Sequence, residues 1–171
     1  MNAGLKSQDL AAVLAVCVCP EAEWSFQSLA QWMGVGRSTL FYALGRAGES
    51  GLYRPESRSV DRVGLAGFIE HGVRWSFYVR LGGRVRGVPT AHSGPALSGE
   101  LLSDATATLV WPTAGGTVVG QALEPLYPQA ACTAAQAPEL YSVLTLVDAV
   151  RLGRRRDTAL ALARLHALLE L

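Results

Sequence analysis

The sequence predicts an α+β fold in three successive parts. Residues 1–72 carry helical patterns and one small hairpin, residues 73–136 form a turn-rich region with short β-strands, and residues 137–171 form a C-terminal helical pair. Two observations support this division. Apolar residues recur at helical spacing near both ends of the chain, whereas glycine and proline turn signals punctuate the middle. Half of the residues are hydrophobic and 17% are charged, which indicates a packed protein rather than a disordered one.

Residues 7–18 and about 25–33 are predicted to form the first two helices. Ser7 is the expected N-cap of the first and Ser25 that of the second, because a side-chain oxygen accepts from a free N–H of the first turn. Gly34 is expected to end the second helix. One apolar face of the first helix is made by residues at i, i+3, i+4 and i+7, namely Leu10, Val13, Leu14 and Cys17.

A third helix is predicted over about residues 37–50. Two short extended arms around a proline turn then predict a small hairpin over 52–60. Asp61 is the expected N-cap of a fourth helix, which ends before Gly72. The inner face of that helix is expected to carry Leu65, Phe68 and Ile69.

The middle region is predicted to contain short strands at residues 73–79, 106–111 and 117–122. The turn at Ala114-Gly115-Gly116 is expected to join the last two strands as a hairpin. Arg84 and Arg86 lie among glycines, so we expect a loop there with both side chains free.

The C-terminal helices are predicted from Pro138 to near Gly153 and over about 155–170. Pro138 suits a first helical position, and Gly153 follows the end of the first of these helices. The apolar stripe of this helix consists of Leu140, Val143, Leu144 and Val147. Apolar stripes of this kind predict that the C-terminal helices form a dimer interface. The alternative is that the stripes pack into the core of the monomer.

The strongest local signal joins the second and third helices. Two helices that meet at a steep angle need a small residue at their contact, which Ala30 supplies, and a glycine in the tight turn, which Gly34 supplies. Val35, Leu40 and Ala43 have the spacing that packs the next helix against the previous one. This arrangement predicts a helix-turn-helix whose second helix can enter a DNA major groove.

A longer series of residues surrounds this motif: Leu29-Ala30, Gly34-Val35, Ser38-Thr39-Leu40, Ala43-Leu44 and Gly51-Leu52. The series resembles the winged helix-turn-helix of bacterial transcriptional regulators of the MarR, IclR and GntR type. The resemblance implies that residues 1–72 bind double-stranded DNA, with the recognition helix at about 37–50 and the wing at about 52–60. The rest of the chain resembles only uncharacterised bacterial proteins, some of which lie beside nucleotidyltransferase-like toxins.

Candidate DNA contacts follow from this arrangement. Arg37 and Ser38 begin the helix that would meet base edges, and an arginine can read guanine through paired donors. Arg54 and Arg58 flank the wing turn and suit backbone phosphates. The full expected set is Arg37, Ser38, Thr39, Tyr42, Arg46, Arg54 and Arg58, with Arg84 and Arg86 as a secondary basic segment. Phe41 is expected to pack on a neighbouring element rather than meet a thymine methyl.

The charge on this region is small. Residues 37–62 contain five arginines against Glu49, Glu56 and Asp61, and the whole chain has a formal net charge of +1. We therefore expect a homodimer, which doubles the phosphate contacts and matches a two-fold operator. The alternative is an antitoxin-like module that uses a helix-turn-helix scaffold to bind a protein partner. Its candidate contacts are residues 111–112 and 126–128, unless these cover the core.

Catalytic and metal sites are not expected. No His-Glu-x-x-His, Gly-x-Ser-x-Gly or phosphate-binding glycine loop occurs, and Thr90, His92 and Ser93 are neighbours in sequence without forming a recognisable triad. Cys17 and Cys19 lack a second ligand pair at zinc spacing, so Cys17 is expected to fill helix core. No cofactor is expected. The sequence shows neither a signal peptide nor a membrane span, which favours a cytoplasmic protein.

Overall fold

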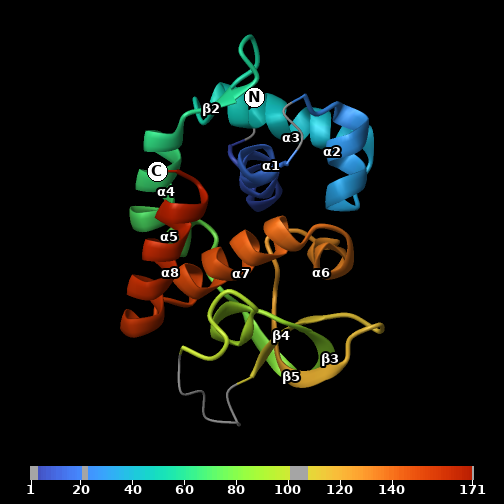
Figure 1. Ribbon diagram of the computed structural model, residues 1–171, viewed down its shortest axis with the longest axis vertical. Coiled ribbons are helices and arrows are strands. Elements are labelled where there is room, and N and C mark those ends of the chain that lie inside the picture. Colours follow the sequence, from blue (N-terminus) through green and yellow to red (C-terminus); the bar gives the residue numbers. More distant parts are fainter. Residues whose placement is uncertain (1–3, 21–22, 101–107, 171) are drawn as a thin grey trace.

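The computed structural model describes residues 4–20, 23–100 and 108–170 of a mixed α+β chain. Helices α1–α3 form one end of the molecule, a small sheet forms the other, and the long helix α7 lies between them (Figure 1). The helices are α1 (Ser7–Val18), α2 (Phe26–Met33), α3 (Arg37–Glu49), α4 (Arg62–His71), α5 (Val73–Ser76), α6 (Thr133–Gln136), α7 (Pro138–Leu152) and α8 (Arg155–Leu168), with 3₁₀ turns η1 (Ala91–Ser93) and η3 (Ala130–Cys132). The strands are β1 (Tyr53–Arg54), β2 (Ser59–Val60), β3 (Leu81–Pro89), β4 (Leu109–Pro112) and β5 (Val118–Leu123).

The helices predicted in the N-terminal region are confirmed, and most of their caps are as expected. Ser25 Oγ accepts a hydrogen bond from the Ser28 amide at 3.0 Å, and Gly34 ends α2 with φ +72°. Asp61 caps α4 by accepting from the Gly64 amide. Ser7, in contrast, is already helical: Lys6 takes the N-cap position, and its amide donates to the Asp9 carboxylate at 2.8 Å.

Helix α1 is buried on every side rather than on the single predicted face. All residues from Asp9 to Ala15 are buried, because α2 and α3 cover one side of α1 and α7 covers another. Alanines at 11, 12 and 15 supply the small side chains that let these neighbours approach. Helix α1 is therefore the centre of the core at this end of the molecule.

The predicted hairpin after α3 is confirmed as an antiparallel pair of two-residue strands. Tyr53 lies opposite Val60 and Arg54 opposite Ser59. The turn between them contains Arg58 with φ +53°, a left-handed conformation that residues other than glycine adopt at an energetic cost.

The strand predicted at residues 73–79 is wrong, because this segment begins as helix α5. Val73 is buried and Phe77 is partly buried, whereas the three residues between them are exposed. The two inward-facing residues are four positions apart, which suits one face of a helix. A strand would instead turn every second residue inward. Phe77 packs edge-to-face on Phe68 of α4 at 5.9 Å between ring centroids.

The sheet differs from the prediction in two respects. Residues 81–89 form strand β3, so Arg84 and Arg86 lie in a strand and not in a loop, although both side chains are exposed. β4 and β5 both pair antiparallel with β3 and pair with each other in parallel, which closes a three-stranded barrel. They therefore do not form the hairpin predicted across residues 114–116. Of the predicted strand 106–111, residues 106 and 107 lie outside the described residues.

Two glycines explain why the chain can cross from β4 to β5. A Cβ at Gly87 would lie 2.1 Å from the Trp111 carbonyl oxygen, and a Cβ at Gly116 would lie 2.3 Å from the Gly87 carbonyl oxygen. Backbone approaches of this kind are open to glycine alone. The turn after β4 thus passes directly over β3, and β5 leaves along the other edge of that strand.

Both predicted C-terminal helices are confirmed, with Pro138 in the first turn of α7 and Gly153 ending it at φ +73°. The apolar stripe of α7 is buried within the chain, against α1 on one side and η1 and α8 on the other. For α7 the stripe closes the core of the monomer, so this helix offers no apolar face for a dimer.

A buried polar cluster ties α7 to the barrel. Asp148 is fully buried and accepts hydrogen bonds from Thr90 Oγ1 at 2.7 Å, Trp111 Nε1 at 2.6 Å and Arg151 Nη1 at 2.6 Å. Arg151 also donates to the carbonyl oxygens of Phe77 and Glu124. Burial raises the pKa of the Asp148 carboxyl, and the Arg151 charge opposes that rise. Trp111 therefore belongs to the core.

The second candidate protein contact, residues 126–128, is also mainly core. Leu126 and Tyr127 are buried, and only Pro128 is exposed. Pro112 is likewise exposed beside the buried Trp111. Neither of the segments expected to contact a partner therefore presents its large side chain to solvent.

Candidate nucleic-acid interface

Helix α3 presents one polar and aromatic face to solvent at the end of the molecule away from the barrel (Figure 1). Its opposite face is buried against α1 and α2 through Leu40, Ala43, Leu44 and Ala47. The 3.6-residue period of the helix therefore turns the intervening side chains outward. The exposed residues of α3 include four of the seven predicted DNA contacts, and they are Arg37, Ser38, Thr39, Phe41, Tyr42, Gly45 and Glu49.

The turn between α2 and α3 is held by a segment from the C-terminal half of the chain. Tyr127 Oη donates to the Met33 carbonyl oxygen at 2.9 Å, and Gln136 Nε2 lies 3.4 Å from the carbonyl oxygens of Gln31 and Trp32. A Cβ at Gly34 would lie 3.2 Å from the same Gln136 nitrogen. These contacts hold the C-terminal end of α2, where the turn begins.

Arg58 folds back from the hairpin turn onto the start of α2. Its Nη2 donates to the Trp24 carbonyl oxygen at 2.6 Å, and its guanidinium carbon lies 4.0 Å from the centroid of the Trp24 ring. Arg58 and Arg37 line a shared hollow together with Ser25, Phe26 and Gln27. Two guanidinium groups and the N-terminal turn of α2 therefore meet at one place.

Arg46 does not belong to the exposed face. Its Nε and Nη2 donate to the two carboxylate oxygens of Asp9 at 2.9 and 2.7 Å. The Asp9 side chain is fully buried, and only 22% of the Arg46 side chain is exposed. The hydrogen bonds and the charge of Asp9 raise the pKa of Arg46. Helical projection alone put Arg46 outward, but its guanidinium is bound to α1.

Replacing Arg46 with alanine is expected to lower the free energy of unfolding by about 1.5–3 kcal/mol, because hydrogen bonds to a buried charge would be lost. Chemical denaturation measures this change. Arg54→Ala is the matched control, since Arg54 is exposed and its Nη2 lies 3.9 Å from Asp61. Such a surface pair contributes less than about 1 kcal/mol. Equal losses in the two variants would contradict the role given to Arg46.

The secondary basic segment lies away from this interface. Arg84 and Arg86 are on β3 in the barrel, with α7 between them and the α3 face (Figure 1). The Arg86 side chain stays close to its own sheet, where Nη1 donates to the Gly116 carbonyl oxygen at 3.4 Å. A straight duplex lying on α3 would not reach either arginine, so they are not part of the same contact surface.

An aromatic row is the feature of this interface that the sequence did not indicate. Trp24, Phe26, Phe41 and Tyr42 contact one another in series, with ring centroids 5.5–5.7 Å apart. Phe41 contacts the Phe26 ring, as expected of a packing residue, yet 58% of it remains exposed. Tyr42 is 63% exposed. The outward face of α3 thus combines cationic, hydroxyl and aromatic groups.

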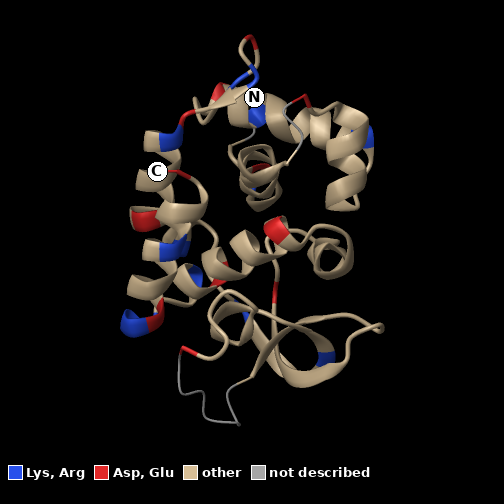
Figure 2. Cartoon of the chain, viewed as in Figure 1, with Lys and Arg blue, Asp and Glu red and all other residues tan. Residues whose placement is uncertain are grey.

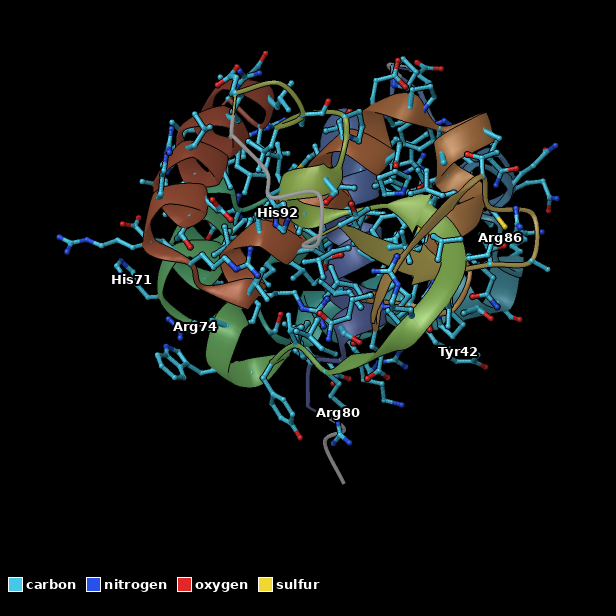
Figure 3. All side chains as sticks on the ribbon, turned by 90° about the horizontal axis from the view of Figure 1, so that it is seen from below. Tyr42, His71, Arg74, Arg80, Arg86 and His92 are labelled. Carbon is cyan, nitrogen blue, oxygen red and sulfur yellow. The ribbon has the colours of Figure 1, made fainter. Side chains whose placement is uncertain are left out.

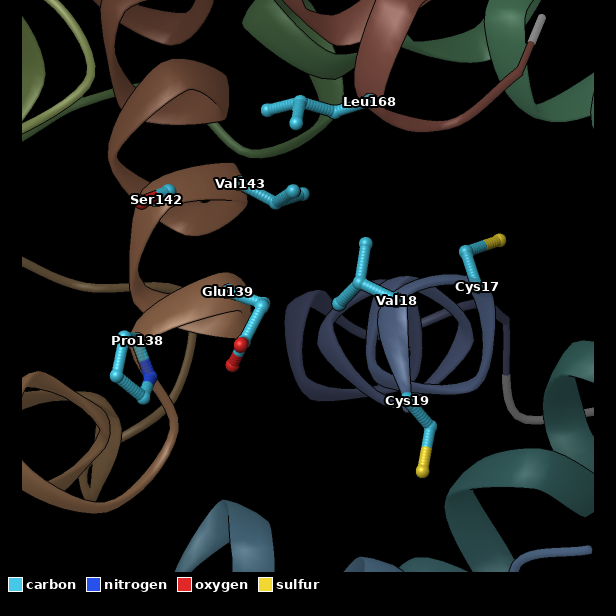
Figure 4. Close-up of a pocket in the computed structure, with 8 residues that line it drawn as sticks. All are labelled: Cys17, Val18, Cys19, Pro138, Glu139, Ser142, Val143 and Leu168. Atoms are coloured by element: carbon cyan, nitrogen blue, oxygen red, sulfur yellow. The ribbon is translucent and has the colours of Figure 1, made fainter. Parts of the chain in front are cut away.

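A groove between α1, α7 and α8 is the other notable hollow near the N-terminal helices. It is lined by Cys17, Val18, Cys19, Pro138, Glu139, Ser142, Val143 and Leu168 (Figure 4). The two cysteine sulfur atoms point to different sides of α1 (Figure 4). Burial raises the pKa of Cys17 to about 11, so its thiol stays protonated near neutral pH. Within the described residues, no group of three or more His, Cys, Asp or Glu side chains could hold a metal ion.

Residues 90–93 act in the core rather than in a cleft. Thr90 donates to Asp148, Ser93 Oγ accepts from the Leu109 amide at 3.1 Å, and buried His92 has its Nδ1 3.8 Å from Asp157 Oδ2. Their hydroxyl and imidazole groups therefore hold η1 against β4, α7 and α8.

Comparison with protein-family models, with curated proteins and with solved structures finds no match to the chain. Among the residues that the structure describes, none of the helices has the length and apolarity required to cross a bilayer.

Proposed function

We propose that residues 1–72 form a winged helix-turn-helix and that the protein binds double-stranded DNA as a transcriptional regulator. In this proposal α3 is the recognition helix and the β1–β2 hairpin is the wing. The convergence of Arg37, Arg58 and the first turn of α2 on one hollow, beside the exposed face of α3, carries the proposal.

The hollow has the chemistry of a DNA phosphate contact. The first N–H groups of a helix point outward without helical partners and favour negative charge. Arg58 is already oriented by its hydrogen bond to Trp24 and its stacking on the ring, so fewer rotamers are lost when it binds.

The outward face of α3 suits contacts in the major groove. Arg37 begins the helix, where base edges are usually read, and can donate two hydrogen bonds to guanine. Ser38, Thr39 and Tyr42 provide hydroxyl groups for bases or phosphates. Phe41 is exposed on the same face and can contact a thymine methyl group. These residues would set the preferred sequence, and the phosphate hollow would set the position of the helix.

Charge supports binding by two copies. Figure 2 shows that cationic residues are sparse at the α2–α3 end of the molecule. Arg46 is held by Asp9 and Arg54 lies near Asp61, which leaves Arg37 and Arg58 as the main cations of the proposed interface. Two cations in one copy give weak binding, so we propose that two copies occupy adjacent half-sites. Because the stripe of α7 is buried, the exposed end of α8 at Leu168 remains for pairing within the C-terminal pair.

Salt dependence tests the phosphate assignment. Each cation that neutralises a phosphate charge contributes about −0.9 to the slope of log K against log[salt]. The two cations of one copy, Arg58 at the backbone and Arg37 in the major groove, therefore predict a slope of about −2, and two copies predict about −4. Arg58→Ala should weaken binding to all duplexes alike and reduce the slope by about 1 for each copy bound. Fluorescence anisotropy with a labelled duplex at several salt concentrations measures both quantities.

Arg84→Ala is the matched control for Arg58→Ala, since Arg84 is exposed on the barrel far from α3. We expect it to leave the affinity and the slope unchanged. An equal effect of the two substitutions would mean that the phosphates do not lie in the hollow.

A further inference from the structure

A second exposed surface lies on α5 and the start of β3. Three of its side chains, Trp75, Tyr78 and Leu81, are large, apolar and 71%, 58% and 45% exposed. Isolated exposed apolar residues are ordinary, but a cluster with a polar rim marks an interaction site. With Arg74 and Arg80, these residues form what we call the basic-aromatic surface. Figure 3 shows Arg80 projecting from the edge of the molecule.

Each arginine of this surface is stacked on a neighbouring ring. The guanidinium carbon of Arg74 lies 4.9 Å from the centroid of Trp75, and that of Arg80 lies 5.4 Å from the centroid of Tyr78. Arg80 also donates to Tyr78 Oη at 2.9 Å. Arg74 packs over Gly153 at the end of α7, where a Cβ would lie 2.4 Å from its guanidinium carbon. Both cations are thus held at the surface in defined positions.

The surface carries more positive than negative charge. Residues 71–99 contain four arginines and no acidic residue. Among the described residues, the ion pairs of arginine side chains involve Arg46, Arg54, Arg151 and Arg164, and not Arg74 or Arg80. Two acidic residues lie at the rim of the surface: Glu70 shares a hollow with Arg155, and the Glu124 amide donates to the Arg80 carbonyl oxygen at 3.2 Å. Guanidinium groups that stack on aromatic rings and keep donors available can bind carboxylates through paired hydrogen bonds.

Two hollows flank Trp75 and are lined mainly by aliphatic side chains. One lies against α7 and α8 and includes Val150, Ala159 and Leu162. The other includes Val79, Leu81 and Leu152. Such concave apolar linings accept aliphatic or aromatic side chains. Stacking of nucleic-acid bases is less favoured, because an arginine already covers one face of each exposed ring.

We propose that the basic-aromatic surface docks an acidic protein segment that carries apolar anchor residues. The carboxylates of the segment pair with Arg74, Arg80 and Arg155, and its apolar side chains fill the two hollows beside Trp75. The surface does not overlap the outward face of α3, so this inference stands without DNA binding. A regulator with both surfaces could hold DNA and a protein partner at once.

Selection of random 12-residue peptides displayed on phage, using the full chain as bait, tests the proposal. We expect enriched peptides to contain at least two acidic residues near a leucine, isoleucine, phenylalanine or tryptophan. Anisotropy of one labelled enriched peptide should then show at least tenfold weaker binding to Trp75→Ala and to Arg80→Glu. Both residues are exposed, so the thermal unfolding midpoint of these variants should not change.

Phe41→Ala is the matched control, because Phe41 is a 58% exposed aromatic residue on the α3 face. It should bind the peptide as the unmodified chain does. Failure to enrich any peptide, a consensus without acidic residues, or unchanged binding by Arg80→Glu would overturn the proposal. Binding of a labelled (dT)12 oligonucleotide that Trp75→Ala abolishes would assign the surface to single-stranded nucleic acid instead, which also overturns it.

Discussion

Replacing Asp148 with alanine is expected to lower the free energy of unfolding by about 3–5 kcal/mol. The Arg151 side chain is 4% exposed, and removal of its partner would leave a buried guanidinium without a counter-charge. The indole of Trp111 and the hydroxyl of Thr90 would also lose their acceptor. Urea denaturation followed by circular dichroism measures the loss.

Glu139→Ala is the control for Asp148→Ala, because Glu139 is an exposed carboxylate in the first turn of the same helix. Its interaction with the helix dipole is worth about 0.3–1 kcal/mol. A loss below about 1 kcal/mol for Asp148→Ala would contradict the conclusion that this cluster ties α7 to the barrel.

Replacing Arg37 and Tyr42 together with alanine is expected to reduce the affinity for a preferred DNA duplex by about 100-fold or more. A specific arginine contact alone is worth about 1–3 kcal/mol, and the hydroxyl group of Tyr42 is lost as well. Both side chains are exposed and α3 is buried through its opposite face, so stability should stay within about 0.5 kcal/mol. Anisotropy titration and thermal unfolding measure the two effects.

The same double variant distinguishes sequence-specific binding from non-specific binding to DNA. Its affinity for an unrelated duplex should fall much less than its affinity for the preferred one. If both affinities were unchanged, α3 would not be the recognition helix.

Helix ends were predictable because their signals are local. Ser25 and Asp61 accept from amides three residues later, and Gly34 and Gly153 take left-handed conformations that end α2 and α7. A cap depends on a few neighbouring residues, so the sequence contains nearly all of the information.

The barrel was not predictable from local pattern. The glycines of residues 82–87 are typical of a loop, yet Gly87 lies in β3. Glycine is needed there because the Trp111 carbonyl oxygen of β4 lies where a Cβ would be. The parallel pairing of β4 and β5 depends on both strands meeting β3, which no turn signal encodes. Both features depend on contacts between residues that are distant in sequence.

The candidate interface was predicted in part for the same reason. Helical period correctly put Arg37, Ser38, Phe41 and Tyr42 on the exposed face of α3. Period could not reveal that Asp9 binds Arg46, since the two residues are 37 positions apart. The position of Arg58 over Trp24 also depends on a tertiary contact, between the hairpin turn and the segment before α2.

Selection of duplex DNA from a random pool, carried out in parallel with the unmodified chain and with Arg37→Ala, tests the central claim most directly. We expect the unmodified chain to enrich a defined, two-fold symmetric sequence. Arg37→Ala should lose the preference at one base pair of each half-site while keeping the spacing of the half-sites. Failure of the unmodified chain to enrich any sequence, at salt concentrations low enough for non-specific binding, would contradict sequence-specific DNA recognition by α3.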